Sequence, residues 1–136
     1  MIILLFLSCT KHDVIDRYAL LEMARKVNPD VAPLMAKDLK SGVKCKTESG
    51  ELIYGQGCIG AFQVKVDLLD MIVLEFETPE MAKREAIRLG QFYFKNWVFD
   101  DVAGEPFLEK FVIKAFAAQK GLAPASPSSG ETKVSN

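Results

Sequence analysis

Two consecutive strand patterns in the middle of the chain constrain its fold more than any other feature. Apolar and polar side chains alternate along residues 59–66, with Phe62 and Val64 on one side, as in a strand with one buried face. A turn near residues 67–70 leads into residues 71–77, a run that is apolar almost to its end. Such a run is expected of a central strand. The chain is therefore predicted to build a sheet on which its other elements pack.

Two helices are expected before these strands. Asp13 can cap the first, in which apolar residues recur at intervals of three and four positions. This helix should end before Pro29, because the residue that precedes a proline disfavours the helical conformation. Asp30 can cap a second, short helix that stops at Gly42. Residues 52–54 then predict a short strand.

The strands are followed by two further helical patterns. Thr78 can cap a helix that has Pro79 at its first position and ends at Gly90. Residues 96–102 predict another strand, and residues 105–121 predict a final helix. The remaining residues, 122–136, are rich in proline and serine and predict a disordered tail.

This order of elements predicts one α+β domain over residues 13–121, with a small, mostly antiparallel sheet and helices packed on one face. The run from Ile72 to Lys83 resembles the step from the third strand to the second helix of RNA-recognition motifs and other ferredoxin-like domains. The resemblance implies a ferredoxin-like fold. RNA-recognition motifs carry exposed aromatic residues on this strand, whereas this chain has Met71 and Val73 there. The net charge of −1 also provides no basic surface for phosphates, so we expect no nucleic-acid partner.

The N-terminus is apolar from residue 1 to residue 7 and becomes polar directly after Cys9. This run is too short to span a bilayer, which takes roughly 20 residues, but it is typical of the end of a signal peptide. The residues Phe6-Leu7-Ser8-Cys9 resemble a bacterial lipobox. The alternative is that residues 1–9 form a buried first strand, with Cys9 in the core.

The lipobox resemblance implies a location for the protein. Residues 1–8 would be the remnant of a signal peptide, Cys9 would carry lipid, and residues 9–12 would tether the domain to a membrane. Thr10, which follows the cysteine, implies the outer membrane, with the domain facing the periplasm. The partners would then be the membrane itself and an unidentified protein of the cell envelope.

The other two cysteines, Cys45 and Cys58, flank a segment with strong turn signals. We expect a disulfide between them, which fits an oxidising compartment such as the periplasm. The alternative is two reduced thiols in the core. A zinc site is not expected, because only His12 could join the two cysteines as a ligand.

No catalytic constellation is recognisable. His12 is the single histidine and lies close to Cys9, so no Ser-His-Asp or Cys-His set can be assembled around a pocket. The adjacent carboxylates Asp100 and Asp101 are interpreted as a turn at a strand end. We therefore expect a non-enzymatic protein without a metal or cofactor.

The aromatic residues concentrate in residues 92–99. Such clusters most often belong to the core. A sheet that is covered on one face only would nevertheless leave part of this apolar surface open, and exposed apolar patches mark interaction sites. The expected interaction surface consists of Phe92, Phe94, Trp97 and Phe99. The sequence thus predicts a lipid-anchored envelope protein with a non-catalytic protein- or peptide-binding domain, or alternatively a cytosolic α+β interaction subunit without an anchor.

Overall fold

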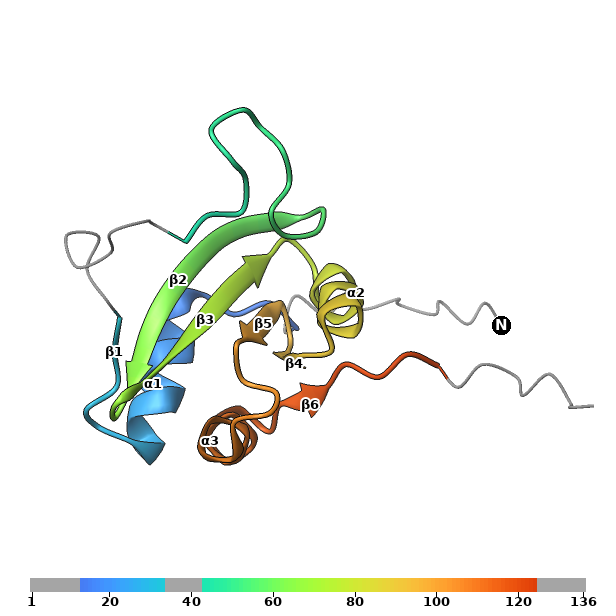
Figure 1. The fold of residues 1–136 in the computed structure, drawn as a ribbon. Helices are drawn as coiled ribbons and strands as arrows, with labels where there is room; N and C mark the ends of the chain where they lie inside the picture. The colour runs from blue at the N-terminus through green and yellow to red at the C-terminus, as the bar shows by residue number, and fades with distance from the viewer. Residues whose placement is uncertain (1–12, 34–42, 125–136) are drawn as a thin grey trace, which may run out of the picture.

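The computed structural model describes residues 13–33 and 43–124. In these residues it shows three helices and a six-stranded antiparallel sheet, which confirms the α+β class (Figure 1). The strand order is β1-β2-β3-β5-β4-β6. The strands are β1 (Ala32–Pro33), β2 (Cys58–Val66), β3 (Leu69–Phe76), β4 (Phe92–Phe94), β5 (Trp97–Asp100) and β6 (Gln119–Lys120). The helices are α1 (Arg17–Val27), α2 (Pro79–Leu89) and α3 (Pro106–Phe116).

The hairpin of β2 and β3 confirms the two central strand patterns. Phe62 pairs with Val73 and Val64 pairs with Met71, so these four side chains share one face of the sheet. Leu68 is at the tip of the hairpin and is 91% exposed. β3 has neighbours on both sides, β2 and β5, and is therefore an interior strand, as its apolar run predicts.

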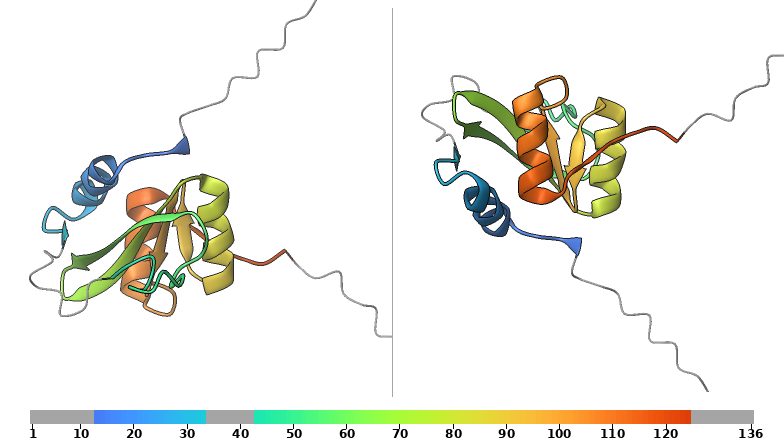
Figure 2. Two further views of the ribbon diagram at one scale, coloured as in Figure 1. Left: turned by 90° about the horizontal axis from the view of Figure 1, so that it is seen from above. Right: turned by 90° about the horizontal axis from the view of Figure 1, so that it is seen from below.

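Helices cover both faces of the sheet, so the prediction that they pack on one face is wrong. Figure 2 shows α2 on one side of the strands and α3 on the other. β3 and β5 explain this arrangement, because they bury apolar residues in both directions. Val73 and Phe99 point to one face, whereas Leu74 and Val98 point to the other. A single layer of helices would leave one of these apolar faces in water.

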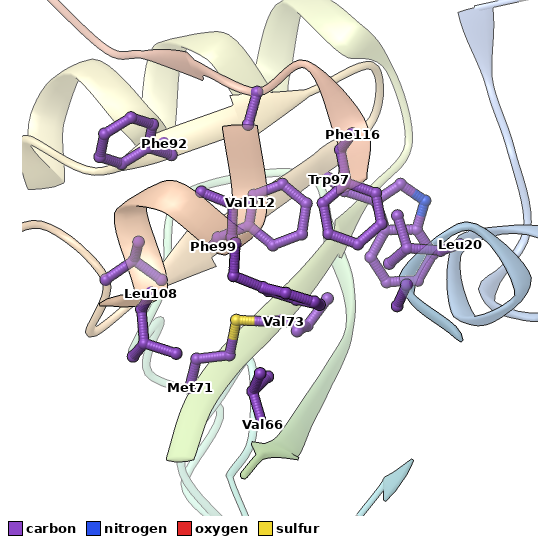
Figure 3. Close-up of a cluster of buried hydrophobic side chains, with 14 of the residues drawn as sticks. Leu20, Val66, Met71, Val73, Phe92, Trp97, Phe99, Leu108, Val112 and Phe116 are labelled. Atoms are coloured by element: carbon purple, nitrogen blue, oxygen red, sulfur yellow. The ribbon is translucent and has the colours of Figure 1, made fainter. Parts of the chain in front are cut away.

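The larger core lies between the sheet, α1 and α3 (Figure 3). Phe99 of β5 stacks on Phe116 of α3 with their ring centroids 4.8 Å apart. Leu20 reaches the same cluster from α1. The cluster also contains Val66, Met71, Val73, Phe92, Trp97, Leu108 and Val112. Aromatic contacts of this kind contribute beyond the burial of apolar area.

The smaller core lies under α2, where Ala82 and Ala86 pack against the opposite face of the sheet. The helix has the predicted ends. The hydroxyl of Thr78 accepts a hydrogen bond from the Met81 N–H at 3.2 Å, and Gly90 adopts the left-handed conformation that ends helices. Ala residues let the helix approach the sheet closely.

Helix α1 begins later than the sequence pattern predicts. Its cap is Asp16, which accepts a hydrogen bond from the Ala19 N–H at 2.8 Å, and not Asp13. The helix ends at Val27, just before Asn28, as predicted. The predicted second helix falls mostly on residues 34–42, outside the described residues. Its expected first turn is instead β1, which pairs with β2.

The C-terminal half contains two short strands that the sequence pattern did not reveal, β4 and β6. The final helix ends at Phe116 instead of Gly121, because Ala117 adopts a left-handed conformation with φ 54°. β6 follows, and the Gly121 N–H donates to the Gln91 carbonyl at 2.7 Å. The strand predicted over residues 96–102 is shorter in the structure, where β5 covers only Trp97–Asp100. Of the expected tail, residues 122–124 are exposed and irregular, and the rest lies outside the described residues.

Candidate functional site

A cavity of about 420 Å³ lies between α1 and the sheet. This volume is in the range of small-molecule sites, about 300–1,000 Å³. Its floor is formed by the sheet residues Met71, Val73, Trp97 and Phe99, and its roof by the α1 residues Leu20, Leu21 and Ala24. Nearly all of the lining is therefore hydrocarbon or aromatic surface. The arrangement suits an apolar guest.

The mouth of the cavity is marked by lining residues that also face solvent. Tyr18 is 66% exposed, and Arg17 and Pro33 are exposed as well. The Arg17 guanidinium carbon lies 5.1 Å from the ring centroid of Tyr18 and 5.8 Å from that of Phe62. Its Nη2 donates to the Tyr18 hydroxyl at 3.2 Å. Two aromatic rings and one hydrogen bond thus hold a cation at the entrance.

Glu75 of β3 belongs to the same face of the sheet, where it pairs with Trp97. Its carboxylate is partly buried, and this burial raises its pKa above the ordinary value. Arg17 counteracts the shift, whereas Asp16 adds to it. The start of α1 therefore places Asp16 and Arg17 near Glu75 of β3, so that one cation and two carboxylates lie together beside the cavity.

Hydrogen bonds hold α1 at both ends. Before the helix, Asn96 and Trp97 bind the backbone of Ile15, with distances of 2.9 to 3.2 Å. After it, the side-chain amide of Asn28 donates to the Asp67 carboxylate at 2.9 Å. The helix also packs beside α3. α1 is therefore attached to the domain at its two ends, and the cavity lies between its middle and the sheet.

The predicted interaction surface is not an open surface. Trp97 and Phe99 are fully buried and Phe92 is 5% exposed, while only Phe94 is partly accessible. The expectation failed because α3 covers the face that was expected to be open. Trp97 and Phe99 nevertheless contribute to the floor of the cavity. Part of the aromatic cluster therefore forms the inner wall of a candidate binding site.

The predicted disulfide is present: Cys45 and Cys58 are bonded, with their Cα atoms 5.7 Å apart. The predicted lipidation site, Cys9, lies outside the described residues. The remaining residues of the candidate site, Arg17 and Tyr18, had no distinguishing signal in the sequence. They form part of an ordinary amphipathic helix, and their role depends on where that helix lies relative to the sheet.

The loop between the two cysteines is fastened to the domain at several points. Tyr54 donates its hydroxyl to the Asp100 carboxylate at 2.8 Å, and the Gly55 N–H donates to the buried carboxylate of Glu85. Arg88 pairs with Glu85. Because Asp100 accepts this bond from Tyr54, it has a structural role. This agrees with the interpretation of Asp100 and Asp101 as a turn at a strand end.

Within residues 13–33 and 43–124, no group of three histidine, cysteine, aspartate or glutamate side chains is arranged to hold a metal ion. In the same described ranges, no helix combines the length and the apolar character needed to cross a membrane. Comparison with known proteins yields no matching family model, no matching curated protein and no matching solved structure. The geometry of the cavity is therefore the main guide to function.

Proposed function

We propose that this protein is a non-catalytic, lipid-anchored binding protein of the bacterial cell envelope, and that its binding site is the cavity under α1. The observation that carries the proposal is the cavity itself. It has a volume of about 420 Å³, its floor and roof are apolar, and exposed residues mark its mouth. A site of this kind captures an apolar group of an envelope molecule and buries it against Trp97 and Phe99.

Two features support the location. The lipobox-like residues before Cys9 provide a point of attachment to the outer membrane, on the periplasmic side. The disulfide between Cys45 and Cys58 suits an oxidising compartment. The Cys9 tether is separated by only a few residues from Arg17, so an anchored protein would hold the mouth of the cavity close to the membrane surface.

Binding of N-phenyl-1-naphthylamine, a neutral apolar fluorophore, tests the proposed site. Trp97 is the single tryptophan of the chain and lines the cavity, so energy transfer from it reports occupancy. We expect saturable binding of one probe per protein. Val64→Phe adds a ring to the lining and should weaken binding about tenfold, which corresponds to about 1.4 kcal/mol.

Leu68→Phe is the matched control, because it makes the same kind of addition at the exposed tip of the hairpin. It should bind the probe like the wild-type protein. Absence of saturable binding to the wild-type protein, or equal binding by Val64→Phe and Leu68→Phe, would contradict the assignment of the cavity as the site.

A further inference from the structure

We infer that the ligand of the cavity is a single-chain anionic amphiphile, whose hydrocarbon chain lies in the cavity and whose carboxylate or phosphate head binds Arg17 at the mouth. This inference rests on the proposed function and specifies its ligand. It follows from two separate properties of the cavity: the chemistry of its interior and the charge at its entrance.

The interior provides no partner for a polar group. Of the four floor residues Met71, Val73, Trp97 and Phe99, Trp97 alone has an N–H group in its side chain, and this group already donates to the Ile15 carbonyl at 2.9 Å. Among the described residues, no buried side-chain nitrogen or oxygen lacks a hydrogen-bond partner. A polar ligand group in the interior would therefore lose its bonds to water without replacing them. A hydrocarbon chain loses none and gains burial of apolar area.

The charge on the cavity lining is positive, although the carboxylates of Asp16 and Glu75 lie nearby. Among the described residues that line the cavity, Arg17 is the charged one, and within the described part of the chain it forms no salt bridge. A guanidinium group has five N–H donors, in a planar fork that matches a carboxylate or a phosphate. The Tyr18 hydroxyl accepts from Nη2. The ring of Phe62 lies below the same guanidinium, so the cation is already positioned for an anionic head.

Glu75 carries the opposite charge to Arg17 and should therefore oppose the binding of an anionic head. It lies near enough to Arg17 for the two charges to influence each other, but it does not line the cavity. Its negative charge should weaken the binding of an anion at the mouth. The inference therefore predicts effects of opposite sign for the two neutralising variants, Arg17→Gln and Glu75→Gln.

Displacement of N-phenyl-1-naphthylamine by ligands of equal chain length tests this. Dodecanoate and dodecyl phosphate carry an anionic head, and dodecanol carries a neutral one. The wild-type protein should bind the anions about tenfold more tightly than dodecanol, as expected for a charge-assisted contact. Arg17→Gln should abolish this preference while retaining the fluorophore. Glu75→Gln should strengthen the binding of both anions.

Arg84→Gln is the matched control, because it removes the same type of charge from the exposed surface of α2, on the opposite face of the sheet. It should keep the preference of the wild-type protein. Equal binding of dodecanol and dodecanoate to the wild-type protein, or an unchanged preference in Arg17→Gln, would overturn the inference while leaving the cavity as a binding site. If Arg17→Gln does not fold, Glu75→Gln decides, since unaltered anion binding by that variant also overturns it. The comparison of dodecanoate with dodecyl phosphate identifies which head group the site prefers.

Discussion

The side-chain amide of Asn96 and the backbone of Ile15 form a reciprocal pair of hydrogen bonds. The Ile15 N–H donates to Asn96 Oδ1 at 2.9 Å, and Asn96 Nδ2 donates to the Ile15 carbonyl at 3.2 Å. Asn96 is fully buried in the turn between β4 and β5. This pair fixes the chain just before α1 and therefore sets where the roof of the cavity begins.

Removal of this pair should destabilise the protein. Asn96→Ala leaves the partly buried Ile15 N–H without its partner, and leaving a buried donor unsatisfied costs about 1–3 kcal/mol. The Ile15 carbonyl keeps the Trp97 indole as a donor, so the loss should stay within that range. Urea denaturation measures it. Asn28→Ala removes two exposed bonds, one donated to the Asp67 carboxylate and one accepted from the Asp30 N–H. It should cost less, because water can replace both partners, and the reverse order would contradict the role assigned to Asn96.

Loss of the disulfide should lower stability further than most single substitutions. The bond between Cys45 and Cys58 closes a loop of 13 residues in sequence separation, and the chain-entropy treatment predicts about 3 kcal/mol for a loop of this length. The double variant Cys45→Ala/Cys58→Ala should therefore unfold at a lower urea concentration. The same shift should appear when the wild-type protein is treated with a reductant, and the variant itself should be insensitive to reductant. A wild-type protein whose two thiols both react with an alkylating agent before reduction would contradict the bond.

Gly121 should not tolerate a side chain. A Cβ atom at this position would collide with the backbone of Ala86 and Ile87 in α2. Backbone atoms within a helix cannot move aside easily, so Gly121→Ala should cost about 1–3 kcal/mol, as for other overpacked sites. Thermal unfolding provides the measurement. Ala123→Val, at an exposed position two residues later, should leave the melting temperature unchanged, and equal melting temperatures for both variants would refute the contact.

Ionisation of Glu75 should reduce stability as the pH rises. Burial raises the pKa of this carboxyl above its ordinary value; Arg17 partly offsets this shift and Asp16 adds to it. The folded protein then binds the proton more tightly than the unfolded chain, so stability falls as the pH passes from the unfolded to the folded pKa. The cost is absent below the unfolded pKa and develops as the pH rises from there through the folded pKa.

Glu75→Gln should accordingly be more stable than the wild-type protein at pH 7, and the difference should vanish at acid pH. Urea denaturation at both pH values measures this difference. Glu48→Gln, at an exposed position of the disulfide loop, is the control for general charge effects. A stability difference for Glu75→Gln that is independent of pH would show that the substitution acts through packing instead.

The proposed anchor should place the native protein in the membrane fraction. Cys9→Ser removes the thiol that would carry lipid and should move the protein to an uncleaved or soluble form. Ser8→Ala keeps a small residue before the cysteine, as signal-peptide cleavage requires, and should remain with membranes. Mass spectrometry of the native protein decides the matter, because an intact Met1 together with an unmodified Cys9 would favour the cytosolic alternative.

The sequence by itself determined the elements whose cause is local. The alternation in residues 59–66 and the apolar run after it define the β2–β3 hairpin. The Thr78 cap and the terminal Gly90 define α2. These patterns depend on neighbouring residues along the chain, so one sequence is enough to recognise them. The cysteine pair was identified similarly, from two residues that flank a turn-rich loop.

Only the tertiary structure decided the start of α1, the two-sided covering of the sheet and the cavity. The pattern alone favours Asp13 as the cap, but the partner of Ile15 is Asn96, 81 residues away, and that contact keeps Ile15 out of the helix. Burial of Trp97 likewise depends on α3 and α1, which approach β5 from distant parts of the chain. The cavity lies between these elements. Long-range contacts of this kind have no counterpart in local periodicity, because they arise from packing between elements that the sequence keeps far apart.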